Sequence, residues 1–268
     1  MGLEGTDAIE ALRLFVLCHA DHEGGNVSAH VSHAVSSAHS DVFYAVVASL
    51  CGLAGPLHGL ANQQALSWQK NALRQVGHDA QKLRDYAHAQ LAAGKKIPGF
   101  GHAVLRVTDP RYTLFREWGE QTLHKAESSA KRKAETSVKR NPKQPRREPP
   151  SDSPVQAPSR SGSGEEISPE ALVRFNHLCA DVITEVMKEY PKIQSPYPNV
   201  DMGSGTVLTA VGIIEPTIYT VLFGLSRCLG VIASGVWSRM LKLPIERPKS
   251  VTLETLNNLV KQAPGNNQ

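Results

Sequence analysis

Apolar residues recur along most of this chain at the spacing i, i+3, i+4 and i+7, which places them on one face of a helix. Two such faces are formed by Leu83, Tyr86, Ala87 and Leu91 and by Leu172, Phe175, Cys179, Val182, Val186 and Tyr190. Helix start signals agree with the pattern, at Ser40-Asp41, Asp109-Pro110 and Ser168-Pro169-Glu170. No segment shows a clear strand alternation and no Asn-Gly hairpin signal occurs. The sequence therefore predicts an all-α fold.

The longest apolar stretch, residues 217–243, is long enough to raise the question of a membrane-spanning helix. Arg227 lies near its middle, and an arginine at a bilayer centre costs at least about 2.5 kcal/mol. We therefore interpret the stretch as a buried helix of a large helical domain and expect no membrane association. In such a domain Arg227 must meet an anion, either a protein carboxylate or a ligand.

A basic segment at residues 125–166 accounts for the net charge of +4. It holds ten Lys or Arg against six acidic residues, together with six prolines, and it has no aromatic residue, leucine or isoleucine. This composition cannot bury enough apolar surface to offset the entropy of ordering, so we interpret the segment as a disordered insertion. Its basic clusters leave open a nuclear-localisation or RNA-binding tract. Aromatic residues that would stack on bases are missing, so no nucleic-acid partner is expected.

The composition of the whole chain suits a folded protein. With 268 residues, of which 41% are hydrophobic, it can bury the core of one large domain or of two closely packed ones. The first residues lack the pattern of a secretory or mitochondrial leader. Cysteines occur singly in apolar runs, a pattern typical of buried free thiols in a reducing compartment. These cysteines are Cys18, Cys51, Cys179 and Cys228.

Three polar residues occupy breaks rich in glycine or proline between helical stretches: His58 in GPLHG, His102 in PGFGHA and Asp201 in PNVDMG. Glycines around a polar residue indicate a sharp turn or a close approach to a ligand. Taken singly, His58 could cap the helix that follows it and Asp201 could be a simple N-cap. Together, a carboxylate base and two imidazoles that donate hydrogen bonds to oxyanions fit proton abstraction next to a carbonyl, followed by carbon–carbon bond formation.

Arginines and further histidines extend this candidate site. Guanidinium forks bind carboxylates and phosphates, so a di- or tricarboxylate or a nucleotide would suit a pocket containing several arginines. The candidate arginines are Arg106, Arg111, Arg227 and Arg247. Histidines at positions 19 and 22 and at 30 and 33 have the spacing of helical metal ligands, but Gly24-Gly25 separates the pairs, so no metal is expected. His22, at that break, is a candidate substrate contact. Motifs for nucleotide hydrolysis, Rossmann dinucleotide binding and serine hydrolysis are absent.

Five motifs, in this order along the chain, closely resemble the citrate synthase family in its eukaryotic mitochondrial form. They are DHEGGNVSAH at 21–30, GLAGPLHGLAN at 52–62, PGFGHAVLR at 98–106, PNVD at 198–201 and ERPKS at 246–250. The similarity runs from about Leu12 to Lys125 and from about Pro169 to Val260, and it leaves out the basic insertion.

The resemblance implies an all-helical homodimer in which each subunit has a large domain and a small domain that closes over the substrates. It implies large-domain parts at 1–58 and 207–268 and a small domain at 59–206 that contains the insertion at 125–166. This chain begins where roughly the C-terminal half of such a protein begins, so the N-terminal part of the large domain is expected to be missing.

The resemblance also implies a role for each candidate residue. Asp201 would abstract a proton from acetyl-CoA, His58 would stabilise the enolate, and His102 would polarise the carbonyl of oxaloacetate. Oxaloacetate would be held by His22, Arg111, Arg227 and, from the partner subunit, Arg247. The CoA moiety would be bound by Ile97, Gly99, Gly101 and Arg106. No metal and no cofactor is implied, since acetyl-CoA is a substrate.

Two other functions remain open on the sequence. The first is 2-methylcitrate synthase, which uses propionyl-CoA. The second is a non-catalytic helical interaction module derived from the same family, with the basic segment recruiting a partner. The resemblance implies the mitochondrial matrix as the compartment, with the cytoplasm as the alternative.

Overall fold

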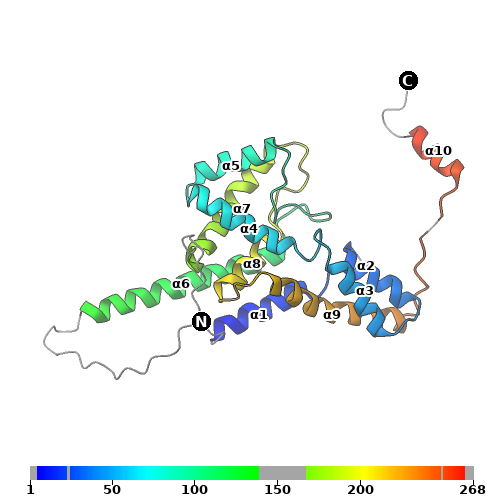
Figure 1. Cartoon of the computed structure of the whole chain (residues 1–268), viewed down its shortest axis with the longest axis horizontal. Coiled ribbons are helices and arrows are strands. Elements are labelled where there is room, and N and C mark those ends of the chain that lie inside the picture. Colours follow the sequence, from blue (N-terminus) through cyan, green and yellow to red (C-terminus); the bar gives the residue numbers. More distant parts are fainter. Residues whose placement is uncertain (1–4, 23–24, 139–166, 249, 263–268) are drawn as a thin grey trace. The chain divides into compact units, whose positions relative to one another are not determined.

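The computed structural model describes residues 5–22, 25–138, 167–248 and 250–262. Within these ranges the chain forms helices joined by turns and loops, with an isolated bridge between Phe100 and Pro198 and no strand, so the all-α prediction is confirmed (Figure 1). The helices are α1 Thr6–His19, α2 Val27–Ser37, α3 Val42–Leu53, α4 Ala61–Val76, α5 Ala80–Ala92, α6 Pro110–Val138, α7 Pro169–Lys188, α8 Val200–Ala210, α9 Thr217–Met240 and α10 Leu253–Gln262.

The chain folds as two compact units, each built from two segments. The first comprises Met1–Ala20 and Ala54–Ser226, and the second comprises Asp21–Leu53 and Arg227–Gln268. These units do not coincide with the domains expected from the sequence, because residues 1–20 and 207–226 group with the segment 59–206. The assignment of a large and a small domain stays a prediction.

The core of the first unit lies where α7 packs against α4, α5 and α8. The periodic faces predicted from the sequence supply much of this core: Leu83 and Ala87 of α5 and Phe175, Cys179 and Val186 of α7 are fully buried. Side-chain caps start both helices. The Asp79 carboxylate accepts from two backbone N–H groups of α5, and the Ser168 hydroxyl accepts from one of α7. Each cap contributes about 1 kcal/mol.

A buried polar cluster fixes the first turn of α8 against its neighbours. The Asn176 side-chain amide of α7 donates to the carbonyl oxygen of Met202 at 2.7 Å, and Gln69 of α4 donates to the same oxygen at 2.9 Å. Tyr112 of α6 donates to Asn176 at 3.1 Å, and Thr206 donates to Gln69 at 3.0 Å. These hydrogen bonds join four helices in a low-dielectric interior. Their shared acceptor, Met202, is the residue that follows Asp201.

Three sequence expectations require correction. Helix α6 continues to Val138, so residues 125–138 of the expected disordered insertion are helical; they are rich in Ala, Lys and Glu, which favour helices, and the first proline comes at position 142. Residues 139–166 lie outside the described ranges.

Helix α9 is long and apolar enough to cross a membrane, but only a third of its most apolar window is buried, which is less than expected for a buried helix. The expectation that all four cysteines are buried is wrong for two of them, because Cys51 is exposed and Cys228 is half-buried.

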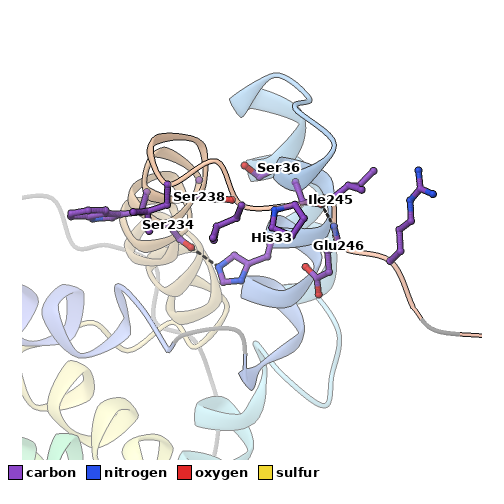
Figure 2. A pocket seen from close by; sticks show the side chains of 13 residues that line it. His33, Ser36, Ser234, Ser238, Ile245 and Glu246 are labelled. Carbon is purple, nitrogen blue, oxygen red and sulfur yellow. Dashed lines mark hydrogen bonds between the residues drawn. The ribbon is translucent and has the colours of Figure 1, made fainter.

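The second unit contains the α2–α3 helical hairpin and the C-terminal part of α9. Helices α2 and α9 approach closely, since a Cβ atom built on Gly235 would lie 3.0 Å from the hydroxyl oxygen of Ser36. One turn earlier on α2, Nε2 of His33 lies 2.6 Å from the hydroxyl of Ser234, the residue before Gly235 on α9 (Figure 2). The segment 244–247 also lies beside α2, where the backbone N–H of Glu246 donates to the hydroxyl of Ser37 at 2.9 Å.

Candidate active site

The loop that carries His102 is joined to the segment that leads into α8. The backbone N–H of Gly101 donates to the carbonyl of Tyr197 at 3.0 Å, and that of Asn199 donates to the carbonyl of Gly99 at 2.9 Å. Gly99 has φ +82°, and a Cβ atom there would lie 3.0 Å from Met202, so both its conformation and the close approach require glycine. The sequence motifs around His102 and Asp201 therefore meet in space.

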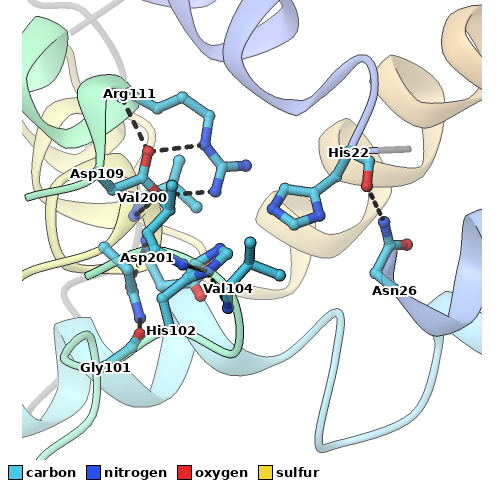
Figure 3. A network of polar contacts seen from close by, with 11 residues as sticks. His22, Asn26, Gly101, His102, Val104, Asp109, Arg111, Val200 and Asp201 are labelled. Carbon is cyan, nitrogen blue, oxygen red and sulfur yellow. Dashed lines mark hydrogen bonds and ion pairs between the residues drawn. The ribbon is translucent and has the colours of Figure 1, made fainter. Parts of the chain in front are cut away.

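His102 is held in one tautomer. Its Nδ1 atom accepts hydrogen bonds from the backbone N–H groups of Val104 at 3.0 Å and Leu105 at 2.9 Å (Figure 3). An accepting Nδ1 is unprotonated, so the proton of the neutral ring is on Nε2. Burial lowers the pKa of His102, and the charges of Arg111 and Arg106 add to this against the opposing charge of Asp109. The imidazole is thus a neutral hydrogen-bond donor through Nε2.

Asp201 lies in the first turn of α8. Asn199 is the N-cap of this helix and accepts from the backbone N–H of Asp201 at 3.0 Å, so the interpretation of Asp201 as a simple N-cap is wrong. Burial raises the pKa of Asp201 to about 6; the Arg111 guanidinium opposes this shift and the Asp109 carboxylate adds to it. A carboxylate with this pKa is suited to accept a proton near neutral pH.

Arg111 and Asp109 form an ion pair at the start of α6. The Asp109 carboxylate accepts from Nε of Arg111 at 3.0 Å and from an Nη nitrogen at 2.6 Å (Figure 3). It also accepts from the backbone N–H groups of Arg111 at 3.0 Å and Val200 at 3.2 Å. Burial alone would raise the pKa of Asp109, but the hydrogen bonds and charge of Arg111 outweigh it and hold the pKa below the usual value. Sequence reasoning missed Asp109, because Asp-Pro before a helix signals only a cap.

His58 belongs to the first unit and lies in the turn before α4. Its backbone N–H donates to the carbonyl of Gly55 at 3.0 Å, and its ring meets the ring of Phe223 edge-on, with centroids 5.5 Å apart. The N-cap of α4 is Leu60, so His58 is not itself the N-cap residue of this helix.

A cavity of about 680 Å³ lies beside Gly101 in the first unit. Its apolar wall includes Ile97 and Tyr190, and its lysines are Lys95, Lys96 and Lys192. Sequence reasoning named Ile97 and Gly101 but missed the lysines, which look like ordinary solvated side chains. Arg106 folds back on its own loop, where one Nη nitrogen donates to the carbonyls of His102, Ala103 and Leu105 at 3.0–3.2 Å.

The other predicted oxaloacetate ligands belong to the second unit. Arg227 is 1% exposed and donates to the side-chain oxygens of Asn26 at 2.7 Å and Ser28 at 2.9 Å. These two partners are neutral side chains, and the anion expected for Arg227 stays a prediction. The His22 carbonyl accepts from the Asn26 side chain at 3.1 Å (Figure 3). Arg247 lines the cavity of about 530 Å³ beside His33 that Figure 2 shows. Among the residues that the structure describes, no group of three or more His, Cys, Asp or Glu could hold a metal ion.

Comparison with solved structures defines the fold class. The chain resembles a citrate synthase of Thermoplasma acidophilum in complex with carboxymethyl coenzyme A and oxaloacetate, with a TM-score of 0.65 and 22% identity over 93% of this chain and 53% of that one. It also resembles a citryl-CoA lyase of Hydrogenobacter thermophilus, with a TM-score of 0.58 and 16% identity over 96% of this chain and 83% of that one. At these identities the likeness concerns the fold.

Sequence comparison gives the family. Residues 3–154 and 159–249 match the family model for the C-terminal domain of citrate synthase, so this chain belongs to the citrate synthase family, as the motifs predicted. Mitochondrial citrate synthases of Fragaria ananassa and Daucus carota are each 40% identical over 265 residues, which cover 98% of this chain and 47% of each relative. The chain spans about half the length of the curated relatives it matches.

Proposed function

We propose that this chain carries the catalytic half of a citrate synthase, which condenses acetyl-CoA with oxaloacetate and water to give citrate and CoA. The observation that carries the proposal is the pairing of Asp201, whose pKa is raised to about 6, with His102, whose Nε2 is a fixed neutral donor. One group removes a proton at neutral pH and the other stabilises a developing oxyanion.

In the proposed reaction Asp201 removes a proton from the methyl carbon of acetyl-CoA. The resulting enolate, stabilised by His58, attacks the carbonyl carbon of oxaloacetate. As the carbonyl oxygen becomes an alkoxide it accepts a hydrogen bond from Nε2 of His102, and the proton that Asp201 removed then passes to this oxygen, which gives the hydroxyl group and returns Asp201 to its carboxylate form. Water then cleaves the thioester of the citryl-CoA formed, which releases citrate and the CoA thiol. Fixing donors before the reaction avoids the cost of reorienting them during it.

Substrate binding is assigned to charged groups in both units. In the first unit Arg111 would hold a carboxylate of oxaloacetate. The lysine-lined cavity beside Ile97 and Gly101 suits a flat base with phosphates, which supports CoA binding there. Gly99 of the same loop would contribute to this binding, and Arg106 would turn towards a phosphate. In the second unit the proposed oxaloacetate ligands are His22, Arg227 and Arg247.

The resemblance to the family assigns Arg247 to the site of a second subunit. We therefore propose a homodimer, and we propose the mitochondrial matrix as its compartment because the citrate synthases of Fragaria ananassa and Daucus carota are mitochondrial.

The test follows release of the CoA thiol from acetyl-CoA by the purified full chain, with and without oxaloacetate. Circular dichroism and size-exclusion chromatography first establish that the sample is helical and not aggregated. Release that depends on oxaloacetate and is lost in Asp201→Ala supports the proposal. Release that persists unchanged in Asp201→Ala contradicts the assigned base, and faster release from propionyl-CoA identifies the 2-methylcitrate reaction instead. A folded sample without release contradicts activity of the chain by itself.

A further inference from the structure

We propose that Asp109 is a positioning residue, which holds one edge of the Arg111 guanidinium so that the other edge is presented to the carboxylate of the substrate. This inference rests on the proposed function, because it takes oxaloacetate as the ligand of Arg111. Nothing in the sequence motifs assigns Asp109 a part beyond the start of a helix.

The geometry of the ion pair is side-on. Asp109 engages Nε and one Nη nitrogen of Arg111 at 3.0 and 2.6 Å, which uses one of the two edges at which a guanidinium presents parallel N–H groups. The opposite edge, which includes the second Nη nitrogen, makes no hydrogen bond within the described ranges of the chain. A ligand carboxylate can therefore form its own fork with Arg111 while Asp109 stays in place.

Burial makes this arrangement rigid. The Asp109 side chain is 2% exposed and the Arg111 side chain is 20% exposed, so the pair is largely out of water but keeps one accessible side. A flexible surface arginine loses side-chain freedom when it binds an anion, and holding it in advance reduces that entropic cost. Arg111 is thus preorganised before a ligand arrives.

The same carboxylate ties Arg111 to the catalytic helix. One oxygen of Asp109 accepts from the backbone N–H of Val200 at 3.2 Å, and the next residue is Asp201. The backbone N–H of Asp109 in turn donates to the carbonyl of Pro198 at 3.2 Å. The buried Asp109 side chain therefore sets the position of Arg111 relative to Asp201. The rate of a reaction between a bound substrate and a catalytic base depends steeply on such positioning.

The competing explanation is that Asp109 only caps α6, since it accepts from the backbone N–H of Arg111. Serine and asparagine are equally good N-caps, but neither carries the charge nor the two-oxygen fork. Asp109→Ser and Asp109→Asn therefore keep the cap and remove the fork. Asp79, which caps α5 through two backbone N–H groups, provides the matched control Asp79→Ser.

The experiment measures the affinity of the full chain for oxaloacetate by isothermal titration calorimetry. We expect Asp109→Ser and Asp109→Asn to raise the dissociation constant about tenfold or more, the loss expected when an arginine fork is no longer held, while Asp79→Ser leaves it unchanged. A second readout is the NMR signal of the Arg111 Nε–H group, identified by its loss in Arg111→Lys. It should be sharp in the parent chain and exchange-broadened in both Asp109 variants.

A double-mutant cycle separates positioning from independent effects. In the Arg111→Lys background, adding Asp109→Asn should cause little further loss of affinity, because the fork is already gone. Losses that simply add, or Asp109 variants that bind as tightly as the parent chain, overturn the positioning role and leave the proposed function standing. A parent chain that is folded but binds no oxaloacetate removes the proposed substrate, and the inference falls with it.

Discussion

The side chain of Asn199 joins the motifs of His102 and Asp201: its amide nitrogen donates to the carbonyl of Gly101 at 2.8 Å, while its oxygen caps the helix that carries Asp201. The corner that holds His102 is therefore fixed directly to the start of α8. Residues about a hundred positions apart in the sequence share one local framework, so the donor and the base cannot move independently.

We expect Asn199→Asp to separate these two contacts. Aspartate keeps the capping oxygen but cannot donate to Gly101. Its second carboxylate oxygen would instead face the carbonyl oxygen of Gly101, which is also an acceptor. Oxaloacetate-dependent thiol release should fall about tenfold or more, because a small misplacement of the His102 corner weakens the oxyanion contact. The melting temperature should change less than in Asn199→Ala, which also loses the cap. Equal activity in Asn199→Asp and the parent chain would show that the link to Gly101 is dispensable.

The raised pKa of Asp201 predicts an acid limb in the rate. Since the base must be ionised, kcat/KM should fall as the pH drops below about 6, where burial places the pKa of this carboxyl. An ordinary aspartate would give a limb near 3.8. The measurement is the initial rate of thiol release between pH 5 and pH 8.5, a range of about three units that covers the limb. A rate that stays flat down to pH 5 is incompatible with Asp201 as the buried base.

The raised pKa of Asp201 also predicts that its ionised form lowers the free energy of unfolding. A raised folded-state pKa means that folding favours the protonated form, so this stabilisation is complete below pH 3.8 and is lost as the pH rises through about 6. At pH 7.5 the ionised carboxylate therefore destabilises the fold by up to about 3 kcal/mol. Asp201→Asn should abolish thiol release yet resist urea better than the parent chain at pH 7.5, with the difference shrinking near pH 4. A variant that is less stable at pH 7.5 would contradict the shift.

The parts of the fold that follow from local patterns could be predicted from the sequence. The apolar faces of residues 79–93 and 169–190 became α5 and α7 as expected, and α7 begins at the predicted Ser168 signal. The sequence also predicted one candidate site for His102 and Asp201, and backbone hydrogen bonds join the two loops that carry them. Arg227 was correctly expected to be buried, although its described partners include the neutral side chains of Asn26 and Ser28.

Features that depend on distant parts of the chain could not be predicted. Asp109 has the sequence signal of an N-cap, and only the fold brings Val200 to its second oxygen. The cavity lysines come from segments almost a hundred residues apart, and each alone resembles a solvated surface charge. The apolar composition of α9 likewise indicates a buried helix, but the sequence does not state which surface covers it, and two thirds of its most apolar window are not buried.

The cavity lysines should set the affinity for the nucleotide part of acetyl-CoA. Replacing Lys95, Lys96 and Lys192 together with alanine removes three positive charges beside one cavity. We expect the KM for acetyl-CoA to rise about tenfold at low salt and less at high salt, because exposed charges are screened, with little change in kcat. The control is Lys82→Ala, which removes a lysine of α5 that lies near Asp79 and does not line the cavity. A salt-independent loss, or a fall in kcat at constant KM, would contradict phosphate binding by these lysines.

Asn176 should be among the most sensitive positions in the first unit. Its amide donates to the Met202 carbonyl and to Gln69 and accepts from Tyr112, so Asn176→Ala removes three buried hydrogen bonds at once. A buried hydrogen bond contributes about 1 kcal/mol, so we expect unfolding in urea to show a loss of about 3 kcal/mol. Asn71→Ala, on the exposed side of α4, should change stability by less than about 0.5 kcal/mol. Comparable values for the two variants would mean that water or rearrangement satisfies the cluster, and that the first turn of α8 does not depend on it.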